Sequence, residues 1–251
     1  MWGIVPAAGI GSRIQPLAFS KELLPVGSRA SGNTERPRAV SEYILERMVI
    51  GGVDKICIIV APDKLDILEY YGAAAGAARL FYAVQPSPAG LCDAIFRARP
   101  LIPFAESVVV GLPDTIWFPA DALRELPDDD FSFLLFPVER PERFDAVLTD
   151  EADRVREIRV KQTTARTRWI WGAFKMPGVI FAELYRLWCD ERGRSDEYIG
   201  TLVNAYLAGG GRARGFRSGS AYFDVGTLAG YREAMQVLSG AGEAHESEAH
   251  K

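Results

Sequence analysis

Near its start the chain reads Gly3-Ile-Val-Pro-Ala-Ala-Gly-Ile-Gly-Ser-Arg13, and a little further on Leu17-Ala-Phe-Ser-Lys-Glu-Leu-Leu-Pro-Val26. The beginning of this stretch, Trp2 to Ala7, is a short apolar run that ends in a glycine-rich turn, which is typical of a buried strand. Open α/β sheets bind their ligands in loops at the carboxyl ends of strands. We therefore expect a ligand site in the loop after this strand.

This loop differs from two common phosphate-binding loops. A dinucleotide-binding fingerprint requires a glycine at position 14, where this chain has Ile14, and a Walker A loop requires Gly-Lys-Ser or Gly-Lys-Thr, which is missing. The loop instead ends in Arg13, and Lys21 follows. Two cations beside backbone N–H groups suit a triphosphate. The alternative is a tight turn with solvated cations.

Short apolar runs alternate with amphipathic segments of helical length over about the first 140 residues. We expect strands at Trp2 to Ala7, Lys55 to Ala61, Leu80 to Val84, Ser107 to Leu112 and Phe131 to Val138, and helices at Arg38 to Ile50, Asp63 to Tyr71 and Leu91 to Ala98. This alternation predicts an α/β fold with a mostly parallel sheet flanked by helices. The polar segment Gly27 to Pro37 is expected to be a loop.

The pattern changes after about residue 140. Three shorter strands are expected at Ala146 to Leu148, Val155 to Val160 and Trp169 to Lys175, and two helices at Gly178 to Cys189 and Asp196 to Leu207. We expect this part to add antiparallel strands that form one wall of a cleft.

Composition places the chain among ordinary globular proteins. It has 251 residues, of which 48% are hydrophobic and 25% charged, and its net charge is −4. No apolar run approaches the roughly 18 residues of a membrane-spanning helix, and Met1-Trp2-Gly3 is no basic leader. We expect a cytoplasmic protein with no membrane partner. A net negative charge also provides no general attraction to nucleic acid.

Cysteine and histidine positions exclude several kinds of chemistry. The three cysteines, Cys57, Cys92 and Cys189, are far apart and far from any histidine, so neither a disulfide framework nor a zinc site is indicated. Both histidines, His245 and His250, lie in the last twelve residues. Catalysis in the folded part must therefore use Asp, Glu, Lys, Arg, hydroxyl groups and backbone.

Three motifs occur in an order that resembles the sugar-phosphate nucleotidyltransferase family. The first is the opening stretch up to Val26, whose Ser20-Lys-Glu-Leu-Leu-Pro25 is closest to the glucose-1-phosphate thymidylyltransferases. Tyr82-Ala-Val-Gln-Pro-Ser-Pro-Ala-Gly-Leu91 resembles the base-recognition loop of the family, and Phe223-Asp-Val-Gly-Thr-Leu-Ala-Gly-Tyr231 resembles its closing aspartate motif. The resemblance implies a Rossmann-like fold. It also implies transfer of a nucleotide from dTTP or UTP to a sugar 1-phosphate, with release of pyrophosphate.

The resemblance assigns the nucleotide side of the site. It implies that Arg13 stabilises the leaving pyrophosphate and that Lys21 binds near the α-phosphate. Gln85 would recognise thymine or uracil, and Gly90 would give the base close access to backbone. The nucleotide would also be bound by the glycine loop, at Ala8, Gly9, Gly11 and Ser12. Without the motif around it, Gln85 reads as a surface loop amide.

Two aspartates are the metal ligands that the resemblance implies. Asp114 follows an apolar strand through Pro113, and Asp224 comes shortly before a predicted helix. Carboxylates, phosphates and waters are the ligands that Mg²⁺ prefers, so Mg²⁺ is the expected cofactor. The alternatives are a turn aspartate for Asp114 and a helix N-cap for Asp224.

The sugar side departs from the family pattern. The resemblance assigns Lys161 and Arg194 to the sugar phosphate and lets the sugar lie against the backbone of Gly172. The chain carries Phe144-Asp145 where the family has Tyr-Gly. We therefore include Asp145 among the predicted sugar-binding residues, because its side chain lies where the family has a glycine. The chain also carries Val160 where the family has a glutamate.

We predict one domain over residues 1–240, with a nucleotide half to about residue 140 and a sugar-phosphate half from 141, followed by a disordered tail at 241–251. Two rival functions stay open. One is a catalytically weak family member that binds nucleotide or sugar phosphate as a regulator. The other is a nucleotide-sugar glycosyltransferase, which would need an Asp-x-Asp metal motif after an apolar strand. In this chain Asp128-Asp129-Asp130 instead precedes an apolar strand. The oligomeric state, including a homo-oligomer, also stays open.

Overall fold

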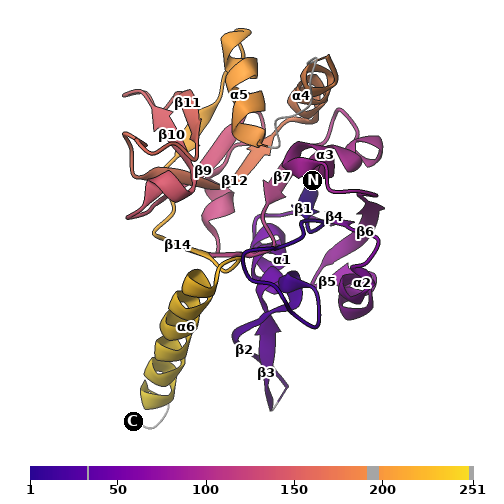
Figure 1. Cartoon of the computed structure of the whole chain (residues 1–251), viewed down its shortest axis with the longest axis vertical. Coiled ribbons are helices and arrows are strands. Elements are labelled where there is room, and N and C mark those ends of the chain that lie inside the picture. Colours follow the sequence, from indigo (N-terminus) through magenta and orange to yellow (C-terminus); the bar gives the residue numbers. More distant parts are fainter. Residues whose placement is uncertain (33, 191–197, 249–251) are drawn as a thin grey trace.

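A mixed ten-stranded sheet forms the centre of the molecule (Figure 1). The computed structural model describes residues 1–32, 34–190 and 198–248. In chain order its elements are β1 (Trp2–Pro6), η1 (Lys21–Leu23), β2 (Pro25–Ser31), β3 (Thr34–Ala39), α1 (Val40–Ile50), β4 (Lys55–Val60), α2 (Leu65–Tyr71), β5 (Ala74–Ala75), β6 (Ala78–Val84), α3 (Gly90–Arg97), η2 (Arg99–Leu101), β7 (Val108–Gly111), β8 (Thr115–Phe118), η3 (Ala122–Glu125), β9 (Ser132–Pro137), η4 (Pro141–Arg143), β10 (Asp145–Thr149), β11 (Val155–Val160), β12 (Trp169–Met176), α4 (Gly178–Asp190), α5 (Ile199–Ala208), β13 (Arg214–Phe216), β14 (Ala221–Asp224) and α6 (Leu228–Glu248).

Parallel pairs join four strands of the predicted nucleotide half, whereas β5 and β9 of that half pair antiparallel with β6 and β12. Strand β1 pairs in parallel with β4 and with β7, and β4 pairs in parallel with β6. The expected α/β class is therefore confirmed. Each strand predicted in this half is present, with ends within two residues of the expected ones.

Antiparallel strands extend the sheet on the side of β7. Strand β12 pairs antiparallel with β7, β9 and β10, and β11 pairs antiparallel with β10. The strands and helices predicted after residue 140 are present, although the predicted start of α5 at Asp196 lies outside the described residues. The sheet thus changes from parallel to antiparallel at the contact between β7 and β12.

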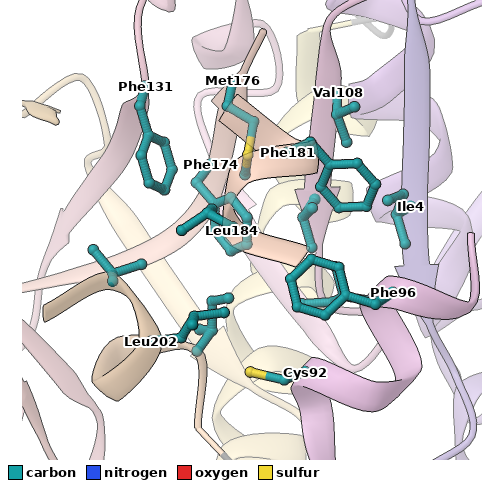
Figure 2. Packing of buried hydrophobic residues seen from close by; sticks show 14 of the residues in the cluster. Ile4, Cys92, Phe96, Val108, Phe131, Phe174, Met176, Phe181, Leu184 and Leu202 are labelled. Atoms are coloured by element: carbon teal, nitrogen blue, oxygen red, sulfur yellow. The ribbon is translucent and has the colours of Figure 1, made fainter. Parts of the chain in front are cut away.

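Both faces of the sheet are covered by apolar side chains, as the two-residue period of a strand requires. In β4, Cys57 and Ile59 belong to one cluster while Ile56 and Ile58 belong to the cluster on the opposite face. Figure 2 shows the first cluster, in which Phe96 of α3 and Phe181 of α4 lie together with centroids 5.4 Å apart.

A polar hairpin and a long helix project from this body (Figure 1). Residues 27–31 and 34–37, expected to be part of a loop, belong instead to the antiparallel pair β2 and β3. Ser31 pairs with Thr34 at the end of this pair. The prediction failed because these strands are mostly exposed and lack apolar alternation.

The end of the chain also differs from its prediction. Helix α6 continues to Glu248, so the backbone of 241–248 is helical where a disordered tail was expected, and 249–251 lie outside the described residues. The reason is that Ala and Glu, frequent in this segment, are strong helix formers even where no apolar stripe is present. Within the described part of the chain, no helix combines the length and the apolar character needed to cross a membrane.

Candidate active site

Two aspartates meet where two distant strands pair. Strands β8 and β14 form an antiparallel pair in which Asp224 lies opposite Thr115. This register places Asp224 beside Asp114, and the N–H of Val225 donates to the carbonyl of Asp114 at 2.9 Å. The two predicted metal ligands, separated by more than a hundred residues in sequence, therefore lie together at the carboxyl end of β7.

Each aspartate is paired with one of the predicted phosphate-binding cations. Lys21 Nζ lies 2.5 Å from Asp114 Oδ2, and Arg13 Nη1 lies 2.9 Å from Asp224 Oδ2. The side chains of Lys21 and Asp114 are both 12% exposed, whereas that of Arg13 is 60% exposed. The lysine is thus fixed in the interior of the site, and the arginine extends into solvent.

The two carboxyl groups differ in proton affinity. Burial alone would raise the pKa of Asp114, but the adjacent charge and hydrogen bond of Lys21 hold it below its ordinary value. Burial and the negative charge of Asp114 raise the pKa of Asp224, and Arg13 only partly offsets them. Burial lowers the pKa of Lys21, yet the charges of Asp114 and Glu22 bring it above its ordinary value. A charged Lys21–Asp114 pair follows.

The surroundings of Gly226 test whether these residues fit Mg²⁺. A Cβ atom built on Gly226 would lie 2.7 Å from Asp114 Oδ2 and 3.0 Å from Asp224 Oδ1. Both carboxylates therefore border the space left by the missing side chain. In the described residues no group of three or more Asp, Glu, His or Cys could hold a metal. A site with two carboxylates, completed by phosphate oxygens and water, fits the coordination of Mg²⁺.

The glycine loop lies directly against Lys21. Gly11 has a φ of +71°, which favours glycine, and a Cβ there would lie 2.6 Å from Lys21 Cδ. Ala8 is buried beneath the loop, while Gly9 and Ser12 are exposed, and nothing lies within 4 Å of the Cβ position of Gly9. The open side of the loop therefore leaves room for a ligand next to the lysine.

A cleft of about 920 Å³ continues from the glycine loop toward Gln85. Ala8 and Ile10 line it on one side, and Gln85 and Pro86 line it on another. Gln85 itself is only 4% exposed. Gly90, with a φ of +85°, is the first residue of α3, so the predicted base-binding pair lies where β6 leads into that helix.

Comparison with known proteins identifies the family of this chain. The nucleotidyl transferase family matches residues 2–240. The chain belongs to this family. A glucose-1-phosphate thymidylyltransferase from Neisseria meningitidis is 28% identical over 253 residues, which cover 95% of this chain and 82% of that protein. A UTP–glucose-1-phosphate uridylyltransferase from Bacillus subtilis is 29% identical over 153 residues, which cover 50% of this chain and 48% of that protein.

The fold is similar to that of solved structures. A Bacillus anthracis protein, described as a glucose-1-phosphate thymidylyltransferase and solved with sucrose, matches with a TM-score of 0.80 at 22% identity over 95% of each chain. The resemblance to the nucleotidyltransferases seen in the sequence motifs is confirmed by these matches.

A buried ion pair that sequence reasoning missed holds the glycine loop of this nucleotidyl transferase. Lys64 Nζ donates to the carbonyls of Ala7 at 2.8 Å and Gly9 at 2.7 Å. It also lies 2.8 and 2.9 Å from the two carboxylate oxygens of Glu22, whose side chain is 1% exposed. One ammonium thus fixes the glycine loop to the residue that follows Lys21. No local pattern signals this contact, because a lysine after Pro-Asp reads as a surface charge.

On the sugar side of this nucleotidyl transferase, the predicted lysine lies beside an aromatic ring. Lys161 follows β11 with a φ of +46°, an uncommon conformation for a residue with a side chain. Its Nζ lies 4.4 Å from the ring centroid of Tyr198. Backbone strain of this kind is concentrated at functional sites. Arg194 lies outside the described residues.

The three residues that depart from the family pattern on the sugar side are neighbours. Asp145 and Val160 face each other across the antiparallel pair of β10 and β11. The ring of Phe144 packs edge-on against Tyr222 at 5.7 Å, and burial together with the charges of Asp224 and Asp114 raises the pKa of Tyr222. Sequence reasoning missed Tyr222, although it lies two residues before Asp224 in the closing motif.

Gly172 lies against two aromatic rings. A Cβ on Gly172 would lie 2.5 Å from the ring of Phe136 and 3.0 Å from that of Tyr222. Aromatic rings occupy the space on the side where a Cβ would point, and access of the sugar to the backbone of this glycine stays a prediction. The absence of a side chain lets the rings of Phe136 and Tyr222 pack with centroids 5.5 Å apart.

Proposed function

We propose that the protein joins a sugar 1-phosphate to dTTP or UTP and releases pyrophosphate, with Mg²⁺ held by Asp114 and Asp224. The observation that carries this proposal is the convergence of these carboxylates with Lys21 and Arg13 beside an open glycine loop. Four charged groups of both signs at the carboxyl end of a parallel sheet suit a reaction between two polyanions.

The reaction needs no general base. A phosphate monoester with a second pKa near about 6 is largely dianionic at neutral pH, so its oxygen is already a nucleophile. That oxygen attacks the α-phosphorus of the triphosphate. The bond from the α-phosphorus to the bridging oxygen breaks, and pyrophosphate leaves with the electron pair. The protein therefore has to position two substrates in line and stabilise the developing charge.

Each residue contributes to these two tasks. Backbone groups of the glycine loop and the ammonium of Lys21 hold the triphosphate near its α-phosphate, and Lys64 keeps the loop in place. The exposed guanidinium of Arg13 can turn from Asp224 to the leaving pyrophosphate. Mg²⁺ bound by the two carboxylates would neutralise charge on the phosphate oxygens.

On the sugar side, Lys161 and Arg194 would bind the sugar phosphate. Asp145 and Phe144 would face the sugar. A cytoplasmic location belongs to the same proposal, since the described cysteines, Cys57, Cys92 and Cys189, form no disulfide, which suits a reducing compartment.

A substrate panel tests the proposal. The protein is incubated with Mg²⁺, one of dTTP, UTP, CTP, ATP or GTP, and a set of sugar 1-phosphates, and both pyrophosphate and the nucleotide sugar are measured. We expect turnover with dTTP or UTP and its loss when EDTA is added. Binding of nucleotide without any turnover across the panel would favour the rival function of a regulator, and turnover that is unaffected by EDTA would contradict the metal assignment.

A further inference from the structure

A hydrogen-bond network lies behind Gln85, on the side away from the cleft. The side-chain nitrogen Nε2 of Gln85 donates to Asp93 Oδ2 at 2.8 Å and to the carbonyl of Gly90 at 3.1 Å. A side-chain amide nitrogen carries two hydrogens. Both donors of Gln85 are therefore used inside the protein, and its carbonyl oxygen Oε1 is the part of the amide left for a ligand.

This orientation of the amide is fixed by charge. If the amide turned by half a rotation, Oε1 would face the Asp93 carboxylate and the Gly90 carbonyl, which are both acceptors. A buried acceptor that faces other acceptors loses its hydrogen bond, so the turned state is disfavoured.

Asp93 is itself held in place. It is 8% exposed and accepts from Arg97 Nε at 3.1 Å and from Arg97 Nη2 at 2.8 Å. Both residues belong to α3, one helical turn apart. Gln85 lines the cleft. Asp93 is not one of the described residues that line it. Asp93 can therefore act on a ligand in the cleft only through Gln85.

We infer that Asp93 is a positioning residue that makes Gln85 present a hydrogen-bond acceptor to the nucleotide base, and so selects uracil or thymine over cytosine. The inference rests on the proposed function, in which the base binds at Gln85. Uracil and thymine carry an N–H at ring position 3, which can donate to Oε1. Cytosine has an unprotonated nitrogen there, and two acceptors would face each other.

The test compares dTTP with dCTP, which differ in this edge while sharing ring size and sugar. Binding of each is measured by calorimetry, and kcat/KM is measured with one sugar 1-phosphate. We expect the wild type to prefer dTTP by about 100-fold, because dCTP would leave two facing acceptors without a hydrogen bond. Asp93→Asn supplies a donor toward Gln85, so its amide can turn and present Nε2. We expect the preference for dTTP to fall at least about tenfold.

Two further variants separate positioning from folding. Asp93→Leu removes the acceptor altogether and should also lower the preference, with the loss appearing in KM for dTTP more than in kcat. Asp121→Asn makes the same chemical change at an exposed residue whose side chain forms no capping bond, and it should leave the preference unchanged. Melting temperatures of all variants show whether each is folded.

The possible outcomes are distinct. If both Asp93 variants fold and keep the wild-type ratio of dTTP to dCTP, the inference is wrong. If Gln85→Ala also keeps that ratio, the base is read elsewhere, and the base assignment of the proposed function fails with it. If Gln85→Ala flattens the ratio while both Asp93 variants keep it, only the role of Asp93 is refuted. Loss of the ratio in Gln85→Ala and in both Asp93 variants supports the inference.

Discussion

The nucleotide half and the sugar half of the site differ in how their charges are held. In the nucleotide half, Lys64 and Glu22 are 9% and 1% exposed and make several hydrogen bonds, and Lys21 contacts Asp114 in the interior. In the sugar half, the Lys161 ammonium lies over the ring of Tyr198. The first half has its charged groups in position before substrate arrives, which lowers the cost of organising them during the reaction.

This contrast indicates where sequence changes are tolerated. A buried charge network requires every partner, so its residues must change together or not at all. A lysine on an aromatic ring can keep its place while the residues around the sugar vary. The departures at Phe144, Asp145 and Val160 all lie in the less constrained half.

The largest effect is expected at the two aspartates where the halves meet. Asp114→Asn and Asp224→Asn should each lower kcat by about 100-fold or more, because a ligand for the metal is lost while shape is kept. Stability should respond unequally. Asp224 pairs with an exposed arginine, whereas Asp114→Asn leaves the buried Lys21 without its counter-charge and should cost about 1–3 kcal/mol. Steady-state rates at saturating Mg²⁺ and urea unfolding provide the measurements, and wild-type rates in both variants would refute the assignment.

The next effect tests whether the nucleotide half is the more constrained one. Lys64→Met leaves the Glu22 carboxylate buried without its partner and should lower the free energy of unfolding by about 3–5 kcal/mol. Lys161→Met in the sugar half should change it by less than about 0.5 kcal/mol. Equal losses in the two variants would remove the contrast between the halves.

A second change isolates the loop from the buried charge. Adding Glu22→Leu to Lys64→Met removes both charges and should recover part of the stability. The carbonyls of Ala7 and Gly9 still lack their donor in this double variant, so KM for the triphosphate should stay raised. Full recovery of KM would show that Lys64 has no role in holding the loop.

A smaller effect concerns sugar choice. We expect glucose 1-phosphate to be used less efficiently than at least one deoxy or amino sugar 1-phosphate, by about tenfold in kcat/KM. Phe144 lacks a hydroxyl, Val160 lacks a carboxylate, and Asp145 adds a negative charge beside both. Asp145→Gly should narrow the difference if the substrate is an amino sugar. Glucose 1-phosphate as the best substrate of the panel would contradict this expectation.

The smallest effect is expected at the end of the chain. Deleting residues 241–251 should leave activity and melting temperature unchanged, because alanine is the only apolar residue type in this segment. Differential scanning calorimetry and the pyrophosphate assay provide the measurements. A drop of several degrees would show that this end of α6 packs against the body or against another copy.

Local patterns were sufficient to predict eight of the ten strands of the central sheet, but they missed β5 and β13 and did not predict all of the pairings. The continuous burial of β4 follows from its sequence, since a strand with two covered faces must be apolar throughout. The pairing of β8 with β14 could not be predicted in this way. Both are four-residue strands, and they join segments that only the whole fold brings together.

The candidate site shows the same division. Arg13, Lys21, Asp114 and Asp224 were found through their motifs, and the structure brings them together. Lys64 was missed because its partners are two backbone carbonyls and a carboxylate from another segment. Asp93 was missed because its role depends on the direction in which an amide points, and no spacing rule encodes that direction.

Strand β12 bears on how this enzyme can be divided. Its eight residues belong to the sugar half, yet they pair with β7 of the nucleotide half and with both β9 and β10. A fragment that ended at residue 140 would expose the hydrogen-bonding edge of β7, with Val108, Val109 and Val110 next to it. Such an edge is a template for association with other chains. The nucleotide half and the sugar half are thus not independent folding units. They should aggregate when they are expressed as separate chains.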